Sequence, residues 1–396
     1  MTGEVNPSGF PLRVAIAYGA FFAAVGVVLP FFPVWLDSKG LSSEQIGLVL
    51  AVPLFARVLA SQPLSAFADR LGERSTALRG YYWLSSIAFI GFWFTDTLTT
   101  ILIVSVAHAF LSAPILPMID SIAMSGVRRF EMDYGKVRLW GSIAFIIANL
   151  AGGLLLSGFD ADAILIALIV LFLLGALSSQ AVPRIGLARK RAASDSPDQS
   201  LFRRRRLMLV FVAAAMIQAS HALVYGFGTL YWQTLGFSGL TIGLLWALGV
   251  LAEVGLMQIT TRLVERFGSM NLLLIGGAGA LVRWTLFPFA TGLEFVVILQ
   301  LLHGLSFGAI HMAMQHYTLE NVSENQMASA QGLSTMLIGL GGAIMTLVSG
   351  GLYEAYGVFG FWVMAALAGV AILVTLVAAR LQPQRAGVGG ETRSSK

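Results

Sequence analysis

Twelve long apolar runs limit what this chain can fold into. Each has about 18 or more mostly apolar residues, the length with which an α-helix crosses ~30 Å of hydrocarbon. A membrane-spanning β-strand would be about ten residues of alternating polarity. We therefore predict an all-α membrane protein with twelve transmembrane helices. The predicted spans are 12–35, 44–68, 76–95, 98–122, 136–158, 161–180, 207–232, 240–264, 270–290, 294–317, 327–350 and 355–381.

Composition supports a membrane protein, because 57% of the residues are hydrophobic and only 11% are charged, outside the usual range of soluble domains. The first run has an apolar core too long for a cleaved signal peptide, and no small-x-small cleavage site follows it, so we expect it to remain as a span. The chain has no cysteine, which excludes disulfides and thiolate metal sites.

Lysine and arginine lie mainly in every second connection between the runs. The connections after the even-numbered runs, and the C-terminal end, carry Arg70, Arg74, Arg79, Arg128, Arg129, Arg184, Arg189, Lys190, Arg191, Arg203 to Arg206, Arg266, Arg380, Arg385, Arg393 and Lys396. The other connections carry Lys39 with several acids. Basic loops stay in the cytoplasm, so we predict that both termini are cytoplasmic. The arginine run at 203–206 indicates a solvated linker that can touch anionic lipid, rather than a nucleic-acid site.

A long polar connection divides the chain into two halves of six runs each. We expect an N-terminal six-helix bundle at 1–180, a basic cytoplasmic linker at 181–206, a C-terminal six-helix bundle at 207–381, and a cytoplasmic tail at 382–396.

The two halves repeat each other at an offset of 196 positions. Under this offset, the following residues are matched: Ile46-Gly47-Leu48 with Ile242-Gly243-Leu244, Asp69-Arg70-x-Gly72 with Glu265-Arg266-x-Gly268, and Arg57 with Glu253. A six-helix repeat in one orientation predicts two pseudo-symmetric bundles, a site between them near the membrane midplane, and alternating access.

One loop carries a family resemblance. The stretch Asp69-Arg70-Leu71-Gly72-Glu73-Arg74 resembles the D-R-x-G-x-R signature of the major facilitator superfamily, although Ser65 stands where that signature usually has a glycine. The resemblance implies a gating role for Asp69, Arg70, Gly72 and Arg74. An acid at a helix end can meet another helix's positive N-terminus in one state and lose it in the other.

Within that superfamily, the stretch DYGKVRLWGS around Arg138 resembles the 3-phenylpropionate permease group, a sister branch of the lactose-permease type proton symporters. The resemblance implies a bacterial inner membrane protein in which Asp120 and Arg138 take part in substrate binding. Arg283 and His303 fall where the lactose type has its proton-coupling arginine and histidine. Gln300 and Ser306 replace the lysine and the acid expected beside them, so we expect Glu253 or Asp120 to carry the proton.

Polar and aromatic residues form stripes on three predicted helices. At about 100° per residue, the stripes cover arcs of roughly 60°, 80° and 120°. They are Arg138, Ser142, Phe145 and Asn149; Gln218, His221, Tyr225, Thr229 and Trp232; and Gln300, His303, His311 and Gln315. Unsatisfied polar groups cost several kcal/mol in hydrocarbon, so these stripes should face the protein interior.

Two sets of site residues follow. Because the resemblance implies that the first helix lines the cavity as well, the candidate substrate-binding residues are Tyr18, Phe22, Arg138, Phe145, Asn149, Gln218, His221 and Tyr225. The candidate proton-coupling or buried charges are Arg57, Asp120, Glu253, Arg283 and His303, since intramembrane charges are costly and mark transport pathways. A lone Gln or Ser can instead hold helices together, and Tyr18, Phe22 and Tyr225 can be core residues.

We hypothesise that Asp120 and Arg138 form an ion pair without substrate, and that an anionic substrate takes the arginine and frees the acid to accept a proton. This hypothesis favours proton-coupled uptake of a small aromatic carboxylate. A sugar or nucleoside symporter is the alternative, because amide side chains suit hydroxyl groups, and small-molecule efflux also stays open.

Other classes of function are disfavoured. The sequence has no H-E-x-x-H, G-x-S-x-G or P-loop motif, so we do not expect an enzyme. His311 and His316 point to different helix faces, so we expect no metal and no cofactor. A receptor on the same scaffold would more naturally carry an added soluble domain. We expect a monomer whose partners are a small-molecule substrate, protons and membrane lipid.

Overall fold

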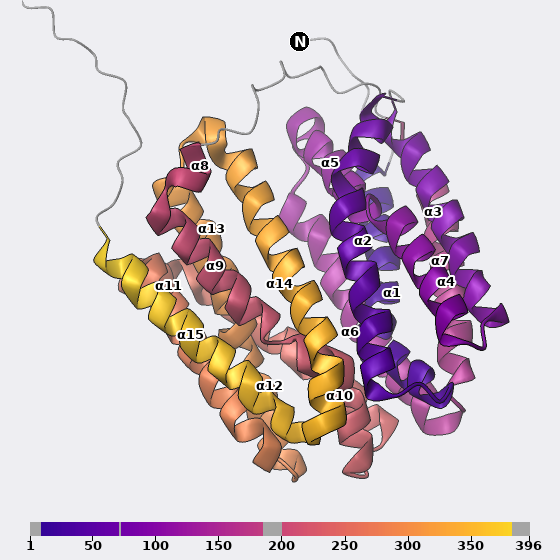
Figure 1. Ribbon diagram of the computed structural model, residues 1–396. Helices are drawn as coiled ribbons and strands as arrows, with labels where there is room; N and C mark the ends of the chain where they lie inside the picture. The colour runs from indigo at the N-terminus through magenta and orange to yellow at the C-terminus, as the bar shows by residue number, and fades with distance from the viewer. Residues whose placement is uncertain (1–8, 71–72, 185–199, 382–396) are drawn as a thin grey trace, which may run out of the picture.

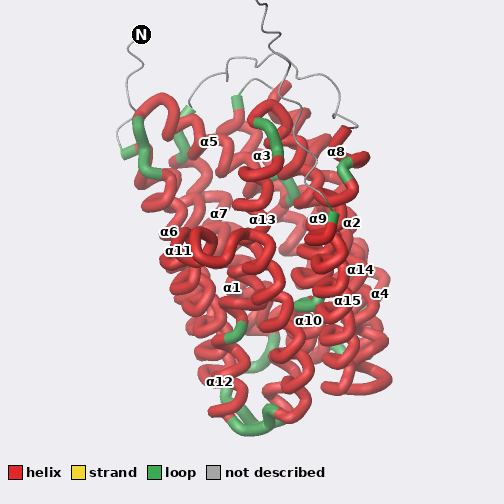
Figure 2. The backbone as a smooth tube through the Cα atoms, turned by 90° about the vertical axis from the view of Figure 1, so that its left-hand side faces the viewer, coloured by secondary structure: helices red, strands yellow, loops and turns green. Residues whose placement is uncertain are grey.

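The computed structural model describes residues 9–70, 73–184 and 200–381 (Figure 1). The first half holds α1 (Phe10–Ser38), α2 (Ser43–Arg70), α3 (Arg74–Ile90), η1 (Gly91–Phe94), α4 (Leu98–Ser112), α5 (Ile115–Phe130), α6 (Tyr134–Gly158) and α7 (Asp162–Ala181). The second holds α8 (Ser200–Arg203), α9 (Arg205–Ala219), α10 (Ala222–Thr234), α11 (Gly239–Leu286), η2 (Phe287–Phe289), α12 (Leu293–Leu301), η3 (Gly304–Ala309), α13 (Ile310–Asn321), η4 (Glu324–Gln326), α14 (Met327–Tyr356), η5 (Gly357–Gly360) and α15 (Phe361–Arg380). These ranges contain no strand, and their loops lie mostly at the two ends of the molecule (Figure 2).

The helices account for the twelve predicted spans. The described residues form nine helical stretches long and apolar enough to cross a membrane. Two of them have 51 and 52 residues, about twice what one crossing needs. One is broken at Gly268, whose φ of 76° is not helical, and the other turns at η5. α3 has 17 residues and supplies the remaining span.

Three spans that we expected to be continuous helices are interrupted. The span at 98–122 is divided into α4 and α5 at Pro114, which has no backbone N–H to continue the helix. The span at 207–232 is divided at Ser220 and His221. There Ser220 Oγ and His221 Nδ1 both donate to the Ile217 carbonyl. In a continuous helix this carbonyl would accept from a backbone N–H, so the side chains compete with the backbone for it.

The third interruption is a π-helical segment in the span at 294–317. This segment, η3, lies between α12 and α13, and its glycines let α11 approach closely. A Cβ on Gly304 would lie 2.8 Å from the Ala252 carbonyl oxygen, and one on Gly308 would lie 3.2 Å from Glu253 Cγ. π-Helical bulges often occur at functional sites, and this one lies beside the cavity described below.

The helices form two bundles of six spans. In the first bundle α1 packs on α6 and α7, while α3 packs on α4 and α7. In the second, α11 packs on η3 and α15, and α9 packs on α14 and α15. The bundles contact each other through α2 with α14, α6 with α11, and α1 with α10. Figure 1 shows the bundles converging toward one end of the molecule and separating toward the other.

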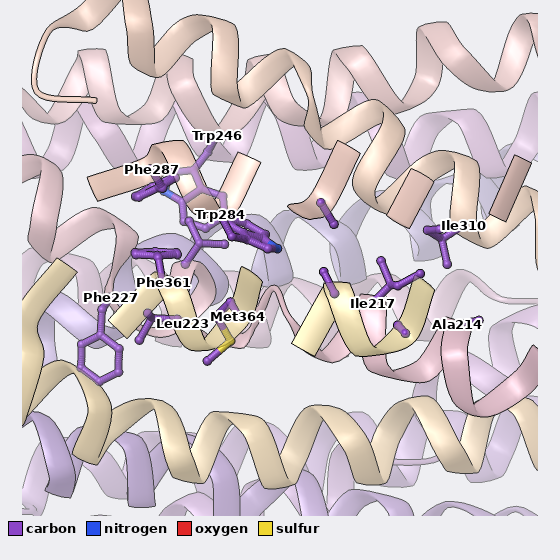
Figure 3. Close-up of a cluster of buried hydrophobic side chains, with 14 of the residues drawn as sticks. Ala214, Ile217, Leu223, Phe227, Trp246, Trp284, Phe287, Ile310, Phe361 and Met364 are labelled. Atoms are coloured by element: carbon purple, nitrogen blue, oxygen red, sulfur yellow. The ribbon is translucent and has the colours of Figure 1, made fainter. Parts of the chain in front are cut away.

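Stacked aromatic rings fill the core of the second bundle (Figure 3). The rings of Phe287 and Phe361 are 4.0 Å apart between centroids, and Trp284 stacks on Phe361 at 5.5 Å. Trp284 Nε1 donates to Ser220 Oγ at 2.8 Å. Since lipid tails are as apolar as this core, close packing and hydrogen bonds rather than burial alone hold the helices together. The helix break at Ser220 is thereby tied to the core.

Two glycine contacts join the bundles at one end, which we call the closed end, where α1 ends and α2 begins. A Cβ on Gly47 would lie 2.6 Å from Gly350 Cα, and a Cβ on Gly153 would lie 2.4 Å from the Gly239 carbonyl oxygen. Such distances are possible only without side chains. We call the opposite end, where α2 ends at Arg70 and α6 begins at Tyr134, the basic end.

Two hydrogen bonds cross the closed end beside the glycines. Ser43 N, at the start of α2, donates to Glu354 Oε2 at 2.7 Å. Leu240 N, in the first turn of α11, donates to Ser157 Oγ at 2.9 Å. In each case a side chain of one bundle satisfies a free amide at a helix N-terminus of the other, so the contacts are polar as well as close-packed.

Enlarging Gly350 should open the closed end. A Cβ at this position would lie 2.7 Å from the Ser43 carbonyl oxygen, whereas a Cβ on neighbouring Gly351 would meet nothing within 4 Å. Because the chain lacks cysteine, spin labels on Lys39→Cys and Tyr356→Cys can report the distance between bundles. We expect Gly350→Val to lengthen it and Gly351→Val to leave it unchanged. An equal change in distance in both variants would contradict the role of the Gly350 contact in holding this end closed.

Candidate functional site

A cavity of about 600 Å³ lies between the two bundles. α1 and α6 form one wall, and α10 to α13 with η3 form the other. The predicted site residues that line it are Phe22, Arg138, Phe145, Tyr225, Glu253, Arg283 and His303. Tyr134, Trp246 and Gln258 also line it and were not among our candidates, although Tyr134 stands in the DYGKVRLWGS stretch. The cavity extends toward the basic end, as far as Tyr134 and Gly135 at the start of α6.

Arg138 lies against aromatic rings rather than against a carboxylate. Its guanidinium is 4.0 Å from the ring centroid of Phe22 and 5.6 Å from that of Tyr18, within the range of cation–π attraction. Asp133, the N-cap of α6, accepts from Lys136 N at 3.1 Å, which holds the pKa of that exposed carboxyl below its ordinary value. The capped first turn of α6 fixes the start of the helix that carries Arg138.

Asp120 is bound by two tyrosines. The hydroxyl of Tyr18 donates to Asp120 Oδ1 at 2.5 Å, and the hydroxyl of Tyr134 donates to the same oxygen at 3.4 Å. Among the described residues, no ion pair joins Asp120 to Arg138. The direct pair that we hypothesised is therefore absent from this conformation, since phenolic donors satisfy the carboxylate and rings hold the guanidinium.

Arg283 is buried at the cavity wall in a network of neutral partners. It is 1% exposed. Its Nη2 donates to Gln300 Oε1 at 2.6 Å, and its Nη1 lies 3.2 Å from Ser306 Oγ and 3.0 Å from His303 Nδ1. A guanidinium can only donate, so His303 Nδ1 must be the acceptor. His303 is therefore a neutral imidazole in this arrangement, because a doubly protonated ring has no acceptor.

The network continues from Ser306 to the helix break in the second bundle. Ser306 Oγ lies 3.1 Å from His221 Nε2, and His221 Nδ1 lies 3.1 Å from the Ile217 carbonyl oxygen. Carbonyls only accept, so Nδ1 carries the proton and Nε2 accepts from the serine. Gln218 Nε2 donates to the Phe307 carbonyl at 3.4 Å. Gln218 and His221 thus connect α9 and α10 to η3 and do not line the cavity.

The remaining candidates lie outside this cavity. Asn149 is buried, and its Nδ2 donates to the Phe145 carbonyl of its own helix at 2.8 Å. Arg57 was predicted as a buried charge, but its side chain is exposed, and it lines a separate chamber in the first bundle. Asp69 and Arg70 belong to the last turn of α2 and Arg74 begins α3, while Gly72 lies outside the described residues. Within the described ranges, no three His, Asp or Glu side chains are grouped to hold a metal ion.

The fold and the cavity define a class of protein. Two six-span helical bundles around a cavity that holds charged side chains and is closed at one end are typical of a membrane transporter. The chain matches the family model described as "MFS_1 like family" over residues 12–364. It belongs to this family, within the major facilitator superfamily of transporters, and not to a class of enzymes.

Named relatives are transporters as well. The chain is 33% identical to the probable 3-phenylpropionic acid transporter of Escherichia coli K12, with 94% of this chain and 97% of the relative covered. It is 27% identical to the maltose permease of Geobacillus stearothermophilus, with 91% and 92% covered.

Solved structures share the fold. The crystal structure of the nucleoside transporter NupG matches with a TM-score of 0.83 at 19% identity, over 94% of this chain and 100% of that one. A bacterial homologue of the human lysosomal transporter Spinster, in an inward-facing and occupied conformation, matches with a TM-score of 0.78 at 13% identity, over 95% and 98%.

Removing one hydroxyl should destabilise the second bundle. Ser306→Ala removes one hydrogen bond from Arg283 and one from His221, at a cost of about 1–3 kcal/mol for the buried groups left unpaired. We expect a lower Tm for the purified protein. Ser349 is equally buried but bonds only to the Met345 carbonyl of its own helix, so Ser349→Ala should lower the Tm less. Equal effects would indicate that the network adds no stability.

Proposed function

We propose that the chain takes up a small aromatic monocarboxylate, such as 3-phenylpropionate, together with protons by alternating access. One observation carries this proposal: Arg138 and Arg283 line the cavity, and neither has an ion pair among the described residues. Two cations facing one acid, Glu253, favour an anionic ligand. A planar guanidinium binds a carboxylate through two parallel hydrogen bonds.

The cavity walls support the aromatic part of the proposal. Phe22, Phe145, Tyr225 and Trp246 line the same space as the arginines, and flat rings suit an aromatic ligand. A volume of about 600 Å³ is within the usual range for small-molecule sites. The relative in Escherichia coli is named for 3-phenylpropionic acid, and its whole-length similarity adds to this argument.

We propose Glu253 as the proton carrier. It is partly buried and lines the cavity beside Arg138 and His311. His303 is less suited in this conformation because its Nδ1 accepts from Arg283, so a second proton would break that contact. A proton on Glu253 would offset the substrate's negative charge during transfer across the membrane.

The hydrogen bonds give less support to a sugar or nucleoside. Amide groups that face the cavity would suit such ligands, yet both ends of the Gln300 amide are occupied, by Arg283 and by the Leu245 carbonyl. Asn149 and Gln218 lie outside the cavity, and Gln258 is the amide left to face it. The similarity to NupG, at 19% identity, concerns the fold and does not support a nucleoside as substrate.

We further propose that the basic end is cytoplasmic, with both termini on that side of a bacterial inner membrane. The cavity would then face the cytoplasm, with 1–180 and 207–381 as the moving units, 181–206 as linker and 382–396 as tail. Asp69, Arg70, Gly72 and Arg74 would form the gating loop between α2 and α3. Each monomer would contain a complete pathway.

Arg138→Gln should weaken 3-phenylpropionate binding by at least tenfold, or about 1.4 kcal/mol, because the carboxylate loses its charged partner. Arg138→Lys should restore part of the loss, and Arg380→Gln, at the exposed end of α15, should change nothing. Binding can be measured by calorimetry on the purified protein. If maltose or thymidine binds and 3-phenylpropionate does not, the substrate assignment is wrong.

Glu253→Gln should separate exchange from proton-driven accumulation. A permanently neutral side chain allows the loaded carrier to move but cannot release a proton. In proteoliposomes we expect the variant to exchange 3-phenylpropionate while losing accumulation under an imposed pH gradient. Glu294→Gln, exposed at the start of α12, is the control. Undiminished accumulation in Glu253→Gln would show that another group carries the proton.

A further inference from the structure

A second cavity, of about 320 Å³, extends into the first bundle. We call it the side chamber. Its walls come from α1, α2, α3, α4 and α7, with residues of α10 and α14 at its border to the second bundle. Leu29 and Tyr225 line both this chamber and the main cavity. The two spaces are thus neighbours that share these two wall residues.

One face of α4 brings polar groups to the side chamber. Ser105, His108 and Ser112 recur at helical spacing and all line it. Arg57 of α2 reaches this face, where its Nη2 donates to Ser112 Oγ at 3.4 Å. Among the described residues Arg57 has no ion pair and no other hydrogen bond. The chamber therefore contains a cation without an anion.

Two further polar groups of the chamber lack partners. The Tyr82 hydroxyl and Ser105 Oγ are buried, with the residues 2% and 5% exposed, and neither has a hydrogen-bond partner in the structure. Leaving a buried polar group unpaired costs about 1–3 kcal/mol, so such groups call for an explanation. The chamber wall therefore includes two residues with unpartnered hydroxyl groups as well as the guanidinium.

The rest of the wall is aromatic and apolar. Phe89 meets Phe92 edge to face at 4.9 Å between ring centroids and Phe172 at 4.5 Å, and Phe32 meets Phe92 at 5.2 Å. His108 is fixed within this group, with its Nδ1 donating to the Ser85 carbonyl at 3.0 Å. A ligand of this chamber must therefore have an apolar body and one charged end.

We propose that the side chamber is a second ligand site, for an amphiphilic monocarboxylate whose carboxylate pairs with Arg57 and whose ring or short chain lies among the phenylalanines. The planar guanidinium favours a carboxylate over a neutral head group. The ligand is either a free acid or a fatty acid from the membrane, since both have this chemistry. The site goes beyond the proposed transport site, which is built on Arg138 and Arg283.

Octanoate binding to the purified full-length protein tests the proposal. We expect Arg57→Gln to weaken octanoate binding at least tenfold, with partial recovery in Arg57→Lys. Ala109→Leu fills the chamber, whereas Ala107→Leu changes the opposite face of the same helix, at an outer groove. We expect only Ala109→Leu to weaken binding. This pair of variants keeps the test valid if an arginine variant fails to fold.

The outcomes are distinct. Binding to protein as purified supports a free acid as ligand, while binding that develops only after delipidation, with fatty acid detected by native mass spectrometry, supports a membrane source. Octanoate affinity unaffected by both Arg57→Gln and Ala109→Leu overturns the second site. Arg138→Gln should leave this octanoate site intact, so loss of the proposed transport function and loss of the side chamber can be told apart.

Discussion

A guanidinium inside hydrocarbon must be bonded or hydrated, and the second bundle is arranged around this constraint. Arg283 is 1% exposed, and its two terminal nitrogens donate to Gln300, Ser306 and His303, while its buried Nε has no hydrogen-bond partner in the described structure. These three partners come from α12, from η3 and from one of the two residues between them, so the irregular segment brings them to one cation. Ser306 also forms a hydrogen bond with His221 at the break between α9 and α10. The interrupted helices and the buried charge therefore depend on each other.

Part of this architecture could be predicted from the sequence, and part could not. The length of the apolar runs predicts the twelve spans, and the distribution of lysine and arginine predicts which helix ends lie on the same side. Both properties belong to the local sequence and do not depend on contacts between distant residues. The breaks in three spans were not predicted. Pro114 was a visible signal, but the breaks at Ser220 and at η3 depend on contacts with distant side chains, such as the bond from Trp284 to Ser220.

The polar stripes predicted which face of a helix points to the protein interior, but not which residues on that face line the cavity. Arg138 and Phe145 of one stripe line the cavity, whereas Asn149 of the same stripe lies at the bundle contact, where its carbonyl oxygen is 2.5 Å from a Cβ built on Gly243. The stripe faces the other bundle along its whole length, and the bundles diverge only toward the basic end. Which part of a stripe reaches the cavity depends on the conformation and cannot be read from the helix alone.

The internal repeat also explains how the closed end is sealed. Gly47 matches Gly243 in the repeat, and Gly350 lies one position from the match of Gly153. The contact of α2 with α14 and that of α6 with α11 are thus related by pseudo-symmetry, as are their crossing bonds from Ser43 to Glu354 and from Leu240 to Ser157. Opening this end must break both contacts, since a rotation that separates only one would drive the other pair of glycine-lined helices together. Rocking of one bundle against the other as a unit meets this requirement, and it moves the cavity walls that carry Arg138 and Arg283 relative to each other.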